Sequence, residues 1–279
     1  MPPPLKPIRP FPLNPALFAQ LPLYAPLQTW LKQGLTSAEE LTAEARRRGL
    51  LTGGGQALSF VAATSTEGYE LQAFRDGTVE TRANNWHDLF GAYVWLAFPR
   101  SKAVLNRRHW QALASADGRR GALRDALTQF DECGVVVLCT DMRLWQDIGA
   151  HRWREVFAER RQEVTQHLRF LVYGHGSYDA LRAPFIGLCG KAVCFEVAAL
   201  PDTLVEQVAL ADGLLAQLFE REDLAKQRWQ PLPLLGLPGA TADNENPAYY
   251  DDQRQFRPLR QSHRPSHIGY PDFPVDRSR

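Results

Sequence analysis

The segment from Trp86 to Phe98 constrains the fold more than any other part of the sequence. It has the length of a helix, and apolar side chains occur on all of its faces rather than along one stripe. A helix that is apolar all round has to be buried. The chain must therefore place other elements on every side of this segment, so the sequence predicts a layered protein with a sizeable core.

The segments around this helix predict a fold of the α+β (mixed α/β) class. The run from Gly134 to Leu138 is rich in Val, which is typical of a core strand. Asp76-Gly77 is a dipeptide that favours a tight turn, and it predicts a hairpin between strands at 69–74 and 78–82. We expect a helix-rich single domain around a small, mainly antiparallel or mixed sheet. Further strands are expected at residues 57–63, 169–173 and 192–198, and helices at 37–48, 101–115, 122–130, 142–168 and 203–219.

The length of 279 residues fits one domain with extensions at both ends. Residues 1–26 are dense in Pro, and residues 27–229 hold the predicted globular domain. Proline recurs every few residues from 230 onward, which excludes long helices there. We expect residues 230–258 to wrap over the domain and residues 259–279, which have little to bury, to be disordered.

Composition narrows the classes of partner and compartment. The chain has 32 basic and 31 acidic side chains and a formal net charge of +1, so no global field attracts nucleic acid. No apolar run is long enough to span a membrane, and the start lacks the apolar region of a signal peptide. A cytoplasmic protein is expected, and a homo-oligomer stays open. The cysteines lie in or beside apolar runs and are expected to be structural thiols: Cys133, Cys139, Cys189 and Cys194.

The first candidate site lies at the start of the buried helix. Asn85, His87 and Asp88 place an amide, an imidazole and a carboxylate within one turn. Capping alone explains two of them, because Asn85 is a natural N-cap with Asp88 at the third helical position. Capping does not require His87, and a helix N-terminus favours the neutral imidazole that serves as a base or a metal ligand.

The second candidate site is Gly174-His175-Gly176-Ser177-Tyr178-Asp179, just after a short strand. The glycines permit unusual backbone angles in this loop. If a helix begins at His175, Asp179 lies one turn further on the same face, as a second ligand or as the group that orients the imidazole. In the alternative interpretation Ser177 caps the helix and His175 binds a backbone carbonyl.

Basic side chains near Pro99 form a third candidate group. Arg100 and Lys102, with His109 further along, could receive a phosphate or a carboxylate near the His87 helix. The plain alternative is a solvated helix face.

Two classes of function follow from these residues. In the first, His87, Asp88, His175 and Asp179 converge in one pocket and form a hydrolase-like site for a small molecule, with a divalent metal as the cofactor it would use. In the second, the protein binds a partner without catalysis and the same residues only cap helices. The distance between His87 and His175 distinguishes the two classes, because two histidines more than about 12 Å apart cannot share one metal ion.

Blocks along most of the chain are similar to a known family. The run from Asn85 to Phe90 continuing to Lys102, the Gly174-His175 segment and residues 184–188 carry the resemblance, as do residues 235–239, 250–252 and 256–258. Over residues 15–260 the chain resembles a proteobacterial family defined only as a domain of unknown function, DUF3025. Asp179 stands where similar sequences have Glu, which shortens the reach of the carboxylate. The resemblance implies no activity, cofactor or catalytic residue.

Overall fold

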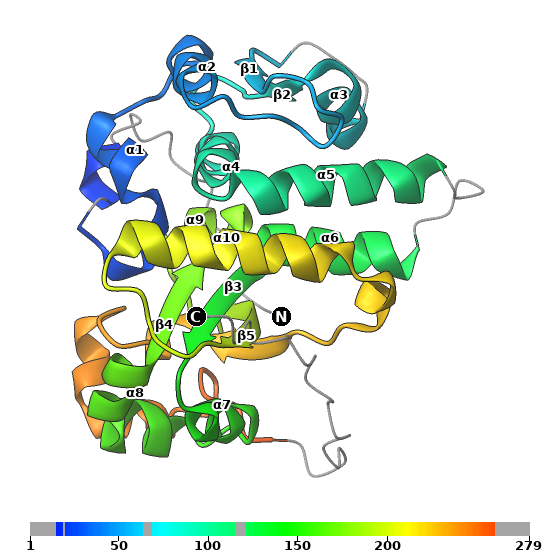
Figure 1. Cartoon of the computed structure of the whole chain (residues 1–279). Coiled ribbons are helices and arrows are strands. Elements are labelled where there is room, and N and C mark those ends of the chain that lie inside the picture. The colour runs from blue at the N-terminus through cyan, green and yellow to red at the C-terminus, as the bar shows by residue number, and fades with distance from the viewer. Residues whose placement is uncertain (1–14, 19, 64–67, 115–120, 260–279) are drawn as a thin grey trace, which may run out of the picture.

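The Val-rich strand at Gly134 lies in the middle of a four-stranded sheet (Figure 1), in a computed structural model that describes residues 15–18, 20–63, 68–114 and 121–259. Strand order is β4-β3-β5-β6, with β3 and β5 parallel and the two outer pairs antiparallel. The expected α+β fold with a mixed sheet is therefore confirmed. The strands are β3 (Gly134–Cys139), β4 (Leu168–Val172), β5 (Cys189–Glu196) and β6 (Gln230–Pro233).

The helix predicted to be buried is α4 (Trp86–Ala97), and its burial is confirmed. Nine of its residues are buried, and the less buried ones, His87, Asp88 and Gly91, lie together on one face. Its burial is complete within one chain, because α9 (His175–Ala180) and α5 (Pro99–Ala114) pack against it. The other helices near the site are α6 (Ala122–Cys133) and α10 (Leu204–Glu220), and α5 packs along α10.

The start of α5 differs from the sequence-based prediction. The predicted helix began at Ser101, whereas the observed helix begins at Pro99 and Ser101 lies inside it. The free amides of the first turn are instead satisfied by Asp212 of α10, whose carboxylate accepts hydrogen bonds from the backbone amides of Arg100 and Ser101 and from the Ser101 hydroxyl. A carboxylate there also favours the helix dipole, so a cap from a distant segment replaces the local one.

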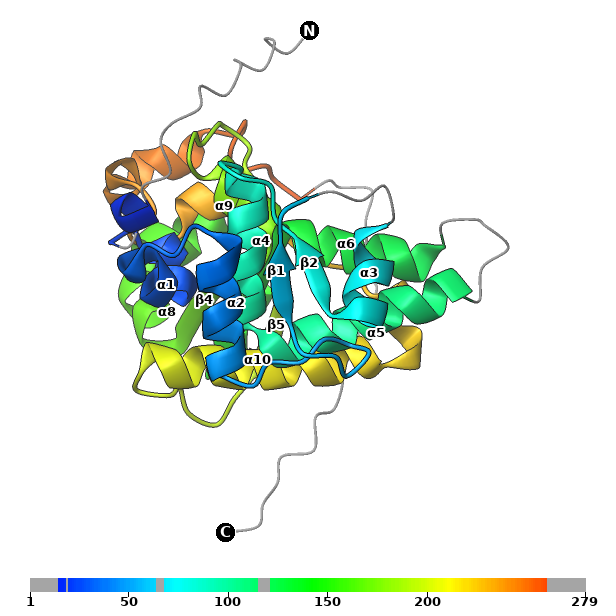
Figure 2. The same ribbon diagram turned by 90° about the horizontal axis from the view of Figure 1, so that it is seen from above.

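The predicted hairpin around Asp76-Gly77 is wrong. Residues 69–76 form helix α3 (Tyr69–Asp76), and β2 (Thr78–Glu80) pairs in parallel with β1 (Ser59–Val61). Gly77 has φ of 74° and ends the helix in the left-handed conformation. Both a tight hairpin turn and a helix C-cap use a glycine with positive φ, so the dipeptide does not distinguish them. From above, β1, β2 and α3 lie nearest the viewer, over α4 and α5 (Figure 2).

The remaining helices cover the outside of this core. The helices predicted at 37–48 and 203–219 are present as α2 and α10, and each begins with a capping box, formed by Ser37 with Glu40 and by Thr203 with Glu206. The other elements are α1 (Gln28–Gln33), α2 (Ala38–Arg47), α7 (Met142–Gly149), α8 (Arg161–His167), a π turn (Glu155–Glu159) and the 3-10 turns Pro15–Phe18, Pro22–Leu27, Glu222–Lys226, Leu234–Gly236, Ala242–Glu245 and Pro247–Asp251.

The chain after residue 230 adds β6 to the sheet edge and continues in 3-10 turns that bury Tyr250 and Phe256. The expected disordered tail at 259–279 lies almost wholly outside the described residues, which end at 259. All four cysteines are free thiols. Among the described helices, none combines the length and apolar character needed to cross a membrane.

Candidate functional site

The start of α4 combines capping with a partly exposed imidazole. The Asn85 side chain accepts a hydrogen bond from the Asp88 amide at 3.0 Å, so Asn85 is the N-cap. Asp88 accepts three hydrogen bonds from Arg82, one from its backbone amide and two from its guanidinium. Burial alone would raise the pKa of Asp88, but the hydrogen bonds and charge of Arg82 lower it. Asn85 and Asp88 are thus held by structural contacts, whereas His87 is left free to face the pocket.

Helix α9 begins at His175, and its glycines allow a close approach to α6. Neither Gly174 nor Gly176 has a positive φ, contrary to the expectation of unusual backbone angles. A side chain at either position would instead collide with Glu132, with its main chain at Gly174 and mainly with its carboxylate at Gly176. The glycines therefore bring the start of α9 against the end of α6.

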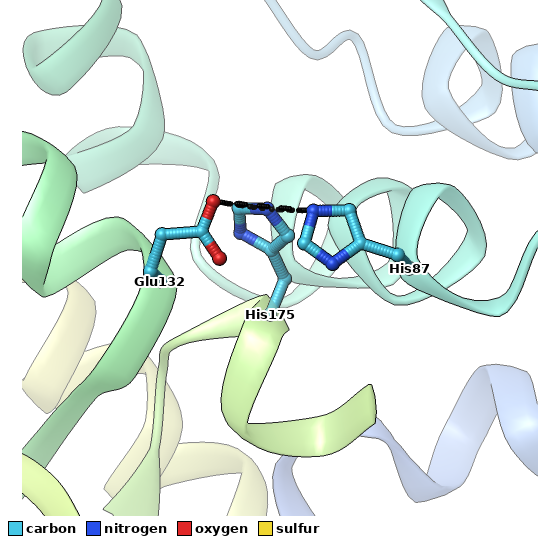
Figure 3. Close-up of side chains that lie close together, drawn as sticks. All are labelled: His87, Glu132 and His175. Atoms are coloured by element: carbon cyan, nitrogen blue, oxygen red, sulfur yellow. Dashed lines mark hydrogen bonds and ion pairs between the residues drawn. The ribbon is translucent and has the colours of Figure 1, made fainter. Parts of the chain in front are cut away.

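Three helices bring His87, Glu132 and His175 together (Figure 3). The Nε2 atoms of the two histidines are 3.1 Å apart. The Glu132 Oε1 atom lies 3.6 Å from Nε2 of His175 and 3.9 Å from Nε2 of His87. The three side chains point toward one another from α4, α6 and α9. The separation test set out from the sequence is therefore met: one ion could contact both imidazoles.

A buried ion pair lies behind His175. Lys102 Nζ donates to Asp131 Oδ1 at 2.7 Å, and the Asp131 Oδ2 atom is 3.7 Å from Nδ1 of His175. Both charged side chains are buried, with at most 9% of either exposed. Burial raises the pKa of Asp131, but the charge of Lys102, with a smaller contribution from His175, outweighs it and lowers that pKa. Burial opposes the charge of Lys102 too, yet Asp131 raises its pKa well above the ordinary value.

His175 is held as a neutral imidazole. Burial lowers its pKa, and the charges of Lys102 and His87 add to that effect, while Asp131 and Glu132 oppose it. Its Nδ1 is buried and has no hydrogen-bond partner among the described residues. A neutral imidazole has a lone pair for a metal ion on one nitrogen and a proton on the other. With Asp131 on the Nδ1 side, the proton belongs there and the lone pair of Nε2 faces His87 and Glu132.

These groups line a cavity of about 390 Å³, a volume within the range of small-molecule sites. His87, Asp88, His109 and His175 all lie on its wall, so four of the side chains singled out in the sequence meet there. Burial lowers the pKa of His109, and the charges of Lys102 and Arg124 add to this, against the opposite effect of Glu70 and Asp131. The pocket thus contains imidazoles that are neutral near pH 7.

Four candidates from the sequence lie outside the pocket wall, and one of them is the N-cap Asn85. Asp179 does share the α9 helix with His175, but its carboxylate accepts a hydrogen bond of 2.6 Å from Arg182. The Arg100 guanidinium lies beside Gly213 of α10. Lys102 is buried and donates to Asp131, and it does not line the pocket.

Asp131 and Glu132 are not among the residues predicted from the sequence, because the predicted helix ended at Phe130 whereas α6 continues to Cys133. One signal was present: two acidic side chains occupy the last turn of α6, where the helix dipole disfavours negative charge. Acidic residues retained at such a position need a compensating cation. For Asp131 that cation is Lys102.

The fold and the site define an α+β protein with a His, His, Glu cluster at the meeting point of three helices. The family model described as a protein of unknown function, DUF3025, matches residues 58–260, and the chain belongs to this family. No protein of curated function matches the chain, and no solved structure matches it.

Proposed function

We propose that His87, Glu132 and His175 bind one divalent transition-metal ion and that the protein is a metal-dependent hydrolase of small molecules. The observation that carries the proposal is the set of three separations between the ligand atoms, 3.1, 3.6 and 3.9 Å. Two ligands about 2.1 Å from a tetrahedral ion lie about 3.4 Å from each other. The cluster has this spacing without any rearrangement.

The kinds of ligand also support a catalytic site over a purely structural one. Two imidazoles and one carboxylate are the set found in hydrolytic zinc sites, where the fourth position is taken by water. The ion would supply a water molecule acidic enough to be a hydroxide near neutral pH. Both His87 and Glu132 are partly exposed, at 36% and 41%, so the open position faces the pocket rather than the core.

The residues of the chain have defined parts in this proposal. His175 is the ligand fixed by its surroundings, because it is mostly buried and Asp131 stands on its Nδ1 side. His87 and Glu132 complete the set from helices α4 and α6. Asp88 is not a ligand in this proposal, because Arg82 already binds both of its carboxylate oxygens.

The test is metal analysis of purified, untagged protein, followed by titration of the metal-free protein with Zn²⁺, Mn²⁺, Fe²⁺ and Mg²⁺. We expect one Zn²⁺ per chain and its loss in the His175→Ala and Glu132→Gln variants. The matched control is Asp179→Asn, which removes a carboxylate from the same helix as His175 and should keep the metal. Zn²⁺ binding that is unchanged in His175→Ala would overturn the ligand assignment.

The same experiment separates two alternatives. The His, His, carboxylate set also occurs in oxygen-using iron proteins. Selective binding of Fe²⁺ with oxygen consumption would replace hydrolysis by that chemistry. Failure to bind any of the four ions would leave the cluster as a structural contact between two histidines and favour the non-catalytic binding protein.

A further inference from the structure

A second feature of the pocket is Arg124, on the same helix as Glu132. Arg124, Thr128 and Glu132 follow one another at intervals of four residues, so they lie on one face of α6, and all three line the pocket. At 1.5 Å per residue, Arg124 and Glu132 are about 12 Å apart along the helix axis. The pocket therefore extends from the His, His, Glu cluster to a guanidinium two turns away.

The positive charge of Arg124 has no partner within the part of the chain that the structure describes. None of the ion pairs between described residues involves it, and its Nε is buried without a hydrogen bond. Arg82, the other arginine on the pocket wall, has a complete ion pair with Asp88 at 2.8 Å. A buried donor without a partner lowers stability, so an arginine kept in this state on a cavity wall indicates a ligand that supplies the acceptor.

Three of the carboxylates on the pocket wall already have other partners in the described part of the chain. Asp88 is bound by Arg82, and Asp131 is bound by Lys102. Glu70 accepts a hydrogen bond of 2.8 Å from the amide of Asn106. His109 lies close enough to Arg124 for the guanidinium to lower the pKa of the imidazole, after the larger effect of burial. His109 is therefore a neutral side chain that can donate one hydrogen bond beside the guanidinium of Arg124.

We infer that Arg124 binds the anionic group of a small substrate, a carboxylate or a phosphate, at the end of the pocket away from the His, His, Glu cluster. A guanidinium fits both groups because its planar N–H donors match two oxygens at once. The cavity of about 390 Å³ accepts a molecule of metabolite size that spans the two ends. The inference names the substrate class and rests on the proposed function for the reaction at the other end of the pocket.

Anion binding is measurable without any reaction. The metal-free protein is titrated with inorganic phosphate and, separately, with succinate, at constant ionic strength maintained with chloride, and binding is followed by NMR shifts of the protein. We expect saturable binding of at least one anion and a loss of about tenfold or more in affinity in Arg124→Gln. Arg124→Lys keeps the charge but not the planar donors, so its anion affinity should lie between those of the wild type and Arg124→Gln. The matched control is Arg46→Gln, at an exposed site on α2.

The outcomes identify the anion and separate this inference from the proposed function. Preference for phosphate or for succinate assigns the substrate's group as a phosphate or a carboxylate. Binding that survives in His175→Ala supports Arg124 even if no metal binds, in which case only the proposed function fails. Equal affinity in wild type and Arg124→Gln overturns the inference, as does binding of neither anion or binding that appears only after Zn²⁺ is added.

Discussion

The carboxylate of Asp131 contacts a lysine with one oxygen and a histidine with the other: its Oδ1 accepts a hydrogen bond from Lys102, and its Oδ2 lies 3.7 Å from Nδ1 of His175. At 3.7 Å the second contact is electrostatic, longer than a hydrogen bond. It orients the imidazole because the carboxylate attracts the N–H of His175. The ion pair in the core and the cluster in the pocket are therefore linked through a single carboxylate.

Removing one member of the buried Lys102–Asp131 ion pair should lower the free energy of unfolding far more than removing both. Lys102→Met or Asp131→Leu alone leaves an unpaired buried charge, with an expected loss of about 3–5 kcal/mol in the free energy of unfolding. The double variant should lose much less than the sum of the two. Urea denaturation of the metal-free proteins measures all three, and a double variant with an additive loss would contradict the coupling.

Substitution of Asp131 should also weaken metal binding at a distance from the ion. Asp131→Asn keeps the shape but removes the charge beside Nδ1 of His175, and we expect about 10–100-fold lower Zn²⁺ affinity. Competition with a chelator measures this change. Asp179→Asn serves as the control, since Asp179 is bound to Arg182. Equal affinities in the two variants would show that Asp131 does not position His175.

Gly176 and Gly91 both lie near His175, and they should respond differently to substitution by alanine. A methyl group at Gly176 meets the carboxylate and main-chain oxygen of Glu132, so Gly176→Ala should displace that ligand and weaken Zn²⁺ binding. At Gly91 the nearest atom is 3.8 Å away in His175, which is an ordinary contact. Gly91→Ala should keep the metal and stabilise α4 by about 0.5–1 kcal/mol. Thermal unfolding and chelator competition test both variants, and unchanged metal affinity in Gly176→Ala would refute the argument.

Acid should destabilise the metal-free protein through its buried histidines. Burial lowers the pKa of His109 and of His175 in the folded state. In the unfolded chain each imidazole takes up a proton near pH 6.5, whereas in the folded protein it does so only at lower pH. The unfolded state therefore binds more protons as the pH falls through this window, and the free energy of unfolding decreases by up to about 1.4 kcal/mol per pH unit for each group.

Urea unfolding at pH 7.5 and 5.5 measures this dependence. His109→Gln should show a smaller decrease between the two pH values than the wild type. An identical decrease would mean that His109 does not contribute.

The sequence predicted best those features that depend on composition within one segment. The burial of α4 and the capping boxes at Ser37 and Thr203 follow from local patterns that tertiary packing did not override. The hairpin failed because Gly77 suits a helix end as well as a turn. Packing selected the helix: Phe74 stacks on Trp110 of α5, a residue far along the chain.

In the candidate site too, the residues recognisable from local sequence were predicted, and those brought in by packing of distant segments were not. His87 and His175 could be found because each stands at a helix start where capping does not explain it. Asp179 satisfied the spacing rule for a partner of His175, but the nearby Arg182 binds it instead. Glu132 takes its place from another helix, and only the close approach of α9 and α6 at Gly176 brings it there.

The pocket has two walls of different origin. All three proposed metal ligands come from α4, α6 and α9, whereas Tyr69, Glu70, Val79 and Glu80 face them from α3 and β2, which contribute nothing to the four-stranded sheet. A substitution on α3 or β2 can reshape the space offered to a ligand while the ligand atoms stay in place. Related chains of this family could thus diverge in what they accept while retaining the same chemistry.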